Sequence, residues 1–162
     1  MASFTELETW KQARKIRMIV SNMVKYFPSE EKFRLADQLI RCSRSIGNNI
    51  AEGYGRFHYQ DNIRFCIIAR GSLSETLDHI IIAKDENIIS EDIFDSFQSE
   101  YDQSLKLLNG YIQFIKRKKN NELEWLACSF QLNQLSQPNQ PLNSINHSHF
   151  FPILATRWAI IW

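Results

Sequence analysis

Apolar residues recur at intervals of three and four along the first 120 or so positions, which is the spacing of an amphipathic α-helix. Proline and glycine interrupt this pattern at few points. Pro28 follows the first apolar run, and Gly53 and Gly55 follow the second. Ser90 precedes the fourth run. Proline breaks a helix, glycine suits its C-terminal end and serine caps its N-terminus, so these residues mark the helix boundaries.

The pattern therefore predicts four helices. Their expected ranges are about 4–27, 30–54, 60–84 and 91–119. We expect Ser3 and Glu6 to form a capping box for the first helix and Ser29 to cap the second. Long amphipathic helices with short connections predict an all-α fold, an up-down-up-down antiparallel four-helix bundle over residues 1–119.

Residues 120–162 have a different composition. Between Gln131 and Ser148, 11 of 18 residues are Asn, Gln or Ser, and two prolines fall in the same stretch. Such a segment buries too little apolar surface to offset chain entropy, so we expect a disordered polar linker. A short apolar C-terminal extension follows. It is too short for a membrane span, which needs about 20 residues. It is either a docking or membrane-surface anchor or an extension without a role.

Charge and cysteine content narrow the class of protein. The net charge is +1, so the whole chain is not a general polyanion binder, but residues 1–56 hold ten Lys and Arg against six Asp and Glu. The three cysteines form no CxxC pair, and the N-terminus does not have the pattern of a signal peptide. These features predict a cytoplasmic protein, with Cys42 and Cys66 packed in the core.

No arrangement of residues predicts catalysis or a cofactor. A di-iron bundle needs Glu-x-x-His on two helices, whereas Glu75 and His79 are four residues apart. The sequence contains neither a nucleophile motif nor a phosphate-binding or dinucleotide-binding glycine loop. We therefore expect no enzymatic activity, no metal site and no cofactor.

A polar insertion interrupts the apolar pattern of the second helix between Ser45 and Gly53. Four polar residues near this point are candidates for one cluster: Asn48, Asn49, Glu52 and, from the third helix, Glu75. On a helical projection Asn49 lies near the core face, whereas Asn48 points away from it. The cluster is either a hydrogen-bond network that fixes helix register or a ligand site.

Basic residues are the remaining lead to a function. The candidate phosphate contacts are Lys11, Arg14, Lys15, Arg34, Arg41, Arg44 and Arg56. Such side chains neutralise phosphates without reading base sequence. The alternative is an ordinary solvated helix surface. In a ring of copies, a small basic patch would become a continuous basic surface.

The segment from Ser45 to Gly53 resembles the bacterial four helix bundle protein family, also called the 23S rRNA intervening sequence proteins. Further matching positions are Trp10, Phe27, Pro28, Leu35, Gln38, Arg41, Arg56, Phe65, Ala69, Gly71, Ser72 and Glu75. The resemblance implies a four-helix bundle that assembles into a ring-like homo-oligomer, often a pentamer. Similar accessory proteins of diversity-generating retroelements bind nucleic acid and a reverse transcriptase. No catalytic residues come with the family, and residues 120–162 lie outside the resemblance.

Together these observations predict a non-enzymatic, cytoplasmic, homo-oligomeric bundle that binds structured RNA or DNA through phosphate contacts. Its expected partners are further copies of itself, rRNA or another nucleic acid, and a reverse transcriptase-like protein. The alternative is a protein-interaction scaffold without nucleic-acid binding. That scaffold would self-associate through Tyr54, Phe57 and Tyr59.

Overall fold

The computed structural model describes residues 3–56 and 58–135, except for the side chains of residues 126–135. The chain divides into two compact units, Met1–Leu123 and Glu124–Trp162, and the helical bundle belongs to the first. The predicted polar linker and apolar extension fall largely on residues 136–162, outside the described part of the chain.

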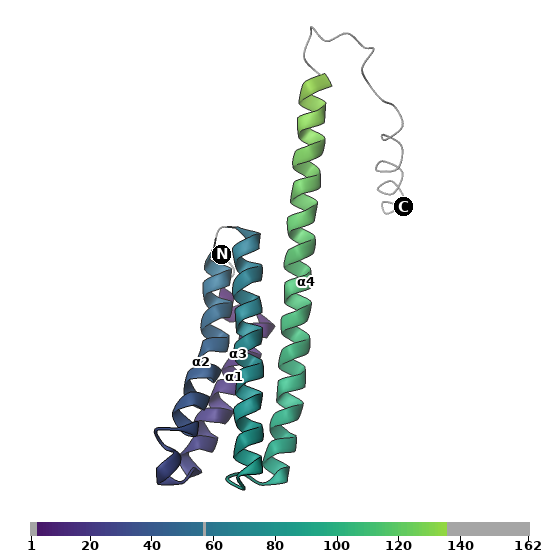
Figure 1. Cartoon of the computed structure of the whole chain (residues 1–162). Helices are drawn as coiled ribbons and strands as arrows, with labels where there is room; N and C mark the ends of the chain where they lie inside the picture. The colour runs from purple at the N-terminus through teal and green to yellow at the C-terminus, as the bar shows by residue number, and fades with distance from the viewer. Residues whose placement is uncertain (1–2, 57, 136–162) are drawn as a thin grey trace. The chain divides into compact units, whose positions relative to one another are not determined.

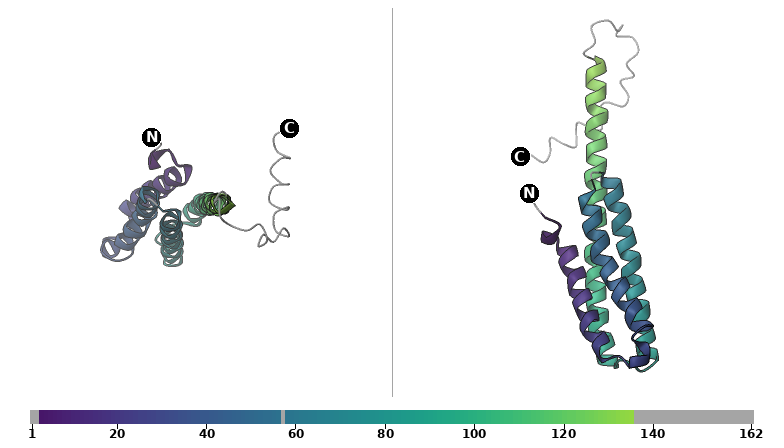
Figure 2. Two further views of the ribbon diagram at one scale, coloured as in Figure 1. Left: turned by 90° about the horizontal axis from the view of Figure 1, so that it is seen from above. Right: turned by 90° about the vertical axis from the view of Figure 1, so that its left-hand side faces the viewer.

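Four α-helices form the described structure, and consecutive helices run in opposite directions (Figure 1). They are α1 (Glu8–Met23), α2 (Leu35–Gly55), α3 (Tyr59–Asp85) and α4 (Glu91–Leu135). Short 3-10 turns, η1 (Phe4–Glu6), η2 (Val24–Tyr26) and η3 (Ser29–Glu31), flank α1 and precede α2. Side-chain hydrogen bonds join α3 to α4, and Figure 2 shows α3 between α2 and α4. The predicted antiparallel four-helix bundle is confirmed.

Two predicted caps are wrong in detail. The Ser3 hydroxyl accepts a hydrogen bond from the Thr5 backbone amide, so it caps η1, and α1 begins only at Glu8. Ser29 is the first residue of η3. A different residue accepts a hydrogen bond from the first backbone amide of α2. The Glu31 carboxylate accepts from the Leu35 backbone N–H at 3.4 Å, which satisfies one of the unpaired amides at the start of the helix.

The fourth helix begins at Glu91 as predicted, but it continues to Leu135 rather than ending near residue 119. Residues 120–135 contain neither glycine nor proline, so their sequence holds no strong helix-breaking residue. The third helix ends where expected. Asn87 adopts a left-handed conformation with φ of 59°, and the Ile88 amide donates to the Ala83 carbonyl at 2.8 Å, which closes α3.

The core lies where the apolar stripes of the four helices meet. The most deeply buried large side chains include Ile16, Val20, Leu39, Ile46, Ile50, Leu73, Ile80, Phe97 and Leu108. Cys42 and Cys66 are buried free thiols, as the sequence predicted. Burial raises the pKa of the Cys66 thiol to about 12, so this thiol stays protonated and unreactive at neutral pH.

Small residues bring α2 and α3 close together. The Ser45 and Ser72 hydroxyls are hydrogen-bonded across the helix pair at 2.9 Å. A Cβ atom built on Gly53 would lie 2.9 Å from the Phe65 Cβ and 3.1 Å from the Asn62 carbonyl oxygen. Gly53 is therefore required for the close backbone approach. Gly71, by contrast, is exposed, and a Cβ atom built on it would meet nothing within 4 Å.

Replacing Gly53 by alanine is expected to lower the free energy of unfolding by about 1–3 kcal/mol, because the new methyl group overlaps α3. The matched control is Gly71→Ala, which adds a methyl group in open space. It should raise stability by about 0.5–1 kcal/mol, since alanine is the better helix former. Urea unfolding followed by circular dichroism measures both. Equal effects of the two substitutions would contradict the close approach at Gly53.

A polar contact ties α4 to α1. The Glu100 carboxylate lies 2.6 Å from the Lys15 ammonium and accepts a hydrogen bond from the Gln12 side-chain amide at 2.8 Å. Hydrogen bonding to Lys15, against partial desolvation, lowers the pKa of Glu100 below its ordinary value of 4.5. The ionised carboxylate is thus favoured in the folded protein.

This depressed pKa predicts a pH-dependent contribution to stability. A carboxyl group with a lowered folded-state pKa stabilises the fold above its unfolded-state pKa, and that contribution disappears as pH falls through the folded-state value. We expect Glu100→Gln to cost about 1 kcal/mol at pH 7, because the Lys15 side chain is half exposed and solvent screens the pair. The difference from wild type should vanish well below pH 4.5. If the stability difference between Glu100→Gln and wild type is the same in acid as at pH 7, the ionised Glu100 carboxylate does not stabilise the fold.

Candidate nucleic-acid interface

All seven predicted basic residues are exposed, but they differ in their partners. Five of them form ion pairs: Lys11 with Glu8, Lys15 with Glu100, Arg34 with Glu31, Arg41 with Asp37, and Arg56 with Glu52. A carboxylate beside a cation cancels much of the field that would attract a phosphate. These five are therefore weaker phosphate ligands than their number suggests.

Arg14 and Arg44 are the two predicted residues without such a partner. Together with Arg17, which was outside the predicted set, they line a surface groove of about 170 Å³ between α1 and α2. Within the described side chains, no carboxylate lies within ion-pair distance of these three arginines. The lining residues of the groove likewise include no Asp or Glu. The groove is thus a local concentration of uncompensated positive charge.

Helical spacing explains why these arginines meet. Arg14 and Arg17 are three residues apart on α1, and Arg44 and Asn48 are four apart on α2, so each pair shares one face of its helix. The two faces border the same groove. Asn48 is exposed there, as its predicted direction away from the core requires.

Aromatic and small residues also line the groove. Trp10 and Phe4 are among its lining residues, and their rings pack edge-on with centroids 5.2 Å apart. The other lining residues are Ala13, Ser43, Gly47 and Ala51. A Cβ atom on Gly47 would meet only Trp10 and Ala13 at ordinary contact distances of 3.7 and 3.9 Å. Gly47 therefore keeps the groove open rather than allowing two helix backbones to touch.

The chemistry of the groove suits a phosphate backbone. A guanidinium group is always charged and presents planar donors that match two phosphate oxygens at once. The Asn48 side-chain amide adds a neutral donor at the same rim. None of these groups needs a particular base, so the arrangement fits sequence-independent contacts.

The four residues of the predicted polar cluster do not come together. Asn49 is half-buried and donates through Nδ2 to the Ser45 carbonyl at 2.8 Å and the Ser45 hydroxyl at 3.0 Å. Because Ser45 is also bonded to Ser72, Asn49 belongs to a network that joins α2 to α3. Glu52 instead pairs with Arg56 on the surface.

Asn48 lies at the groove, and Glu75 is exposed on α3, with one carboxylate oxygen 3.9 Å from His79 Nε2. The interhelical network is thus built from Asn49 and two serines. This arrangement favours the interpretation that the polar insertion fixes helix register.

Other site types find no support in the described residues. No three His, Cys, Asp or Glu side chains among them gather closely enough to hold a metal ion. No helix in the described part of the chain has the length and apolar character that crossing a bilayer requires.

Comparison with known proteins places the chain in a family. The model of the family described as 23S rRNA-intervening sequence protein matches residues 5–110. A solved structure from Bacteroides thetaiotaomicron, a protein of unknown function from the S23 ribosomal protein family, has the same fold with a TM-score of 0.61. It is 24% identical, and the match covers 65% of this chain and 95% of that one. No curated protein matches the chain. The chain belongs to the 23S rRNA-intervening sequence protein family.

Proposed function

We propose that this protein is a non-enzymatic, homo-oligomeric bundle that binds structured RNA or DNA through phosphate contacts in the α1–α2 groove. The observation behind the proposal is the set of three arginines, Arg14, Arg17 and Arg44, around a groove lined by no acidic residue. Elsewhere on the first two helices, basic residues are paired with carboxylates. On these two helices, the positive charge that attracts a polyanion is therefore least compensated at this groove.

The family favours RNA as the ligand. Its name refers to sequences that intervene in 23S rRNA, and the similar Bacteroides structure is assigned to a ribosomal protein family. A folded rRNA segment presents closely spaced phosphates on a rigid backbone. Arginines on two facing helices can contact such a backbone from both sides of the groove.

Exposed apolar residues on α3 support self-association. Ile67 and Ile81 are 44% and 38% exposed, and they lie on one face of the helix, about four turns apart. Ile68 beside them is 45% exposed. Burying this surface against another copy would be favourable, and several copies would place several arginine grooves on one particle.

Two measurements test nucleic-acid binding and the oligomeric state of the protein together. Fluorescence anisotropy at low salt, with a labelled RNA stem-loop and a DNA hairpin of the same stem, should show saturable binding of the full chain. Light scattering after size exclusion should give a particle larger than 19.1 kDa that takes up the RNA. An oligomer that binds neither probe would support the scaffold function instead. A monomer would remove the self-association proposal.

A further inference from the structure

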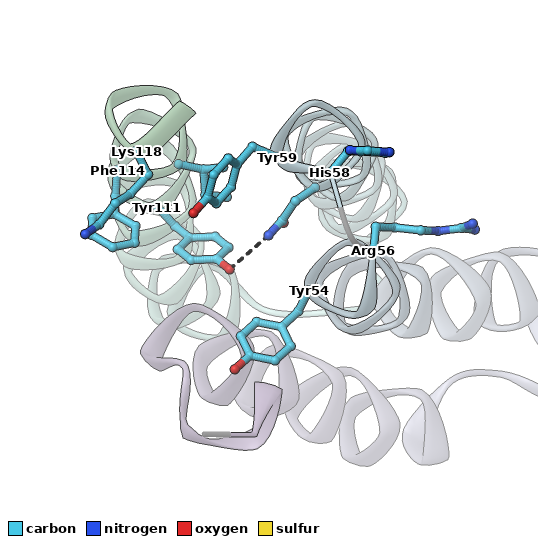
Figure 3. Close-up of a pocket in the computed structure, with 9 residues that line it drawn as sticks. Tyr54, Arg56, His58, Tyr59, Tyr111, Phe114 and Lys118 are labelled. Atoms are coloured by element: carbon cyan, nitrogen blue, oxygen red, sulfur yellow. Dashed lines mark hydrogen bonds between the residues drawn. The ribbon is translucent and has the colours of Figure 1, made fainter. Parts of the chain in front are cut away.

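A second surface hollow lies between the start of α3 and α4, beside the end of α2, with a volume of about 240 Å³ (Figure 3). Four aromatic rings line it: Tyr54, Tyr59, Tyr111 and Phe114. Three separate segments of the bundle supply these rings. Figure 3 shows the Tyr59 and Tyr111 side chains in the space between α3 and α4. From the sequence, Tyr54 and Tyr59 were expected only on a self-association surface.

Two of these rings are open to solvent. Tyr59 is 39% exposed and Phe114 is 50% exposed. The Phe114 ring stacks on Tyr111 with an interplanar angle of 17° and a centroid distance of 6.4 Å. A flat ligand could therefore extend an aromatic stack that the protein already begins.

Polar groups deeper in the hollow can meet the edge of such a ligand. The Tyr111 hydroxyl accepts a hydrogen bond from Asn62 Nδ2 at 3.4 Å, and its own hydrogen can still be donated. Burial raises the pKa of Tyr111, so the hydroxyl keeps that hydrogen at neutral pH. The hollow thus combines exposed aromatic faces with a hydrogen-bond donor.

The charged residues of the hollow are cationic. Arg56 and Lys118 line it, and its lining includes no Asp or Glu. The Lys118 ammonium lies 5.7 Å from the centroid of the Phe114 ring, and Arg56 also pairs with Glu52 outside the hollow. Aromatic rings combined with nearby cations are the features that bind single-stranded nucleic acid, because bases stack on the rings and phosphates meet the cations.

We propose that this aromatic hollow receives an unpaired base of RNA or DNA, stacked against Tyr59 or Phe114, with Lys118 near the adjoining phosphate. The proposal rests on the proposed function and extends it. The α1–α2 groove would hold the backbone of any structured nucleic acid, whereas the aromatic hollow would favour molecules with a single-stranded loop or end. A duplex cannot use it, since its bases are already stacked and paired.

The test compares two RNA probes, a hairpin with an unpaired loop and a blunt duplex of the same stem, by anisotropy with the full chain. Tyr59→Ala and Phe114→Ala should each weaken hairpin binding about tenfold and leave duplex binding unchanged. Tyr59→Phe should bind like wild type, because it keeps the ring. Matched controls are Tyr26→Ala and Phe33→Ala, which remove rings that are 87% and 84% exposed at other sites.

Several results would overturn the proposal. The first is that neither Tyr59→Ala nor Phe114→Ala weakens hairpin binding. The second is that these variants weaken hairpin and duplex binding equally. The third is that the Tyr26→Ala and Phe33→Ala controls weaken hairpin binding as much as they do. A change in particle mass without a change in hairpin binding would instead assign the aromatic hollow to contacts between copies. Hairpin binding that depends on the groove arginines but not on the rings would retain the proposed function and reject this one. If wild type binds neither probe, both proposals fail.

Discussion

A variant with Arg14, Arg17 and Arg44 all changed to glutamine is expected to bind a structured RNA about 100-fold more weakly, or worse, at low salt. Each charge-assisted contact to a phosphate is worth about 1–3 kcal/mol, and three such contacts are removed. Glutamine keeps the polarity of the side chain and is a good helix former, so the fold should persist. Anisotropy with a labelled stem-loop measures the loss, and circular dichroism checks the helices.

The matched control changes the same number of charges at paired positions. Lys11, Arg34 and Arg41 all neighbour carboxylates on their own helix or the preceding turn, at 2.6, 3.5 and 3.4 Å. Their triple change to glutamine should weaken RNA binding only a few-fold, by lowering the general positive field. Equal losses in the two triple variants would mean that overall charge, rather than the α1–α2 groove, attracts the nucleic acid.

Phe97→Ala is expected to have the largest effect on stability, lowering the free energy of unfolding by about 3–5 kcal/mol. Phe97 is 1% exposed and belongs to the shared core of the bundle, so its removal leaves a cavity where α4 packs on the other helices. Urea unfolding followed by circular dichroism measures the change. The control is Phe114→Ala on the same helix, where the ring is 50% exposed and the cost should be below about 1 kcal/mol. Similar costs at the two positions would contradict the packing of α4.

The fold was predictable because the spacing of apolar residues within each helix already shows which side of that helix is buried. The stripe of Leu39, Ile46 and Ile50 has helical period, and all three side chains are fully buried. The length of α4 was underestimated for an equally local reason. A polar composition after residue 130 suggested disorder, yet nothing before Pro138 is a strong helix breaker.

The functional groove was only partly predictable. Four of the five ion pairs join residues three or four apart, such as Asp37 with Arg41, so sequence spacing alone could have set those basic residues aside. The pair of Lys15 with Glu100 depends on tertiary packing, as does the meeting of Arg17 with Arg44. Which faces of two helices meet depends on their rotation about their own axes. Because the sequence does not give that rotation, it does not single out Arg17.

The most direct test of the central claim is the salt dependence of RNA binding by the wild-type chain. If the groove holds phosphates, the logarithm of the binding constant should fall linearly with the logarithm of salt concentration. Three contacts per chain predict a slope of about −2 to −3, because each neutralised phosphate releases condensed counterions. Binding whose strength does not change with salt, or no binding at low salt, would contradict the phosphate-contact account.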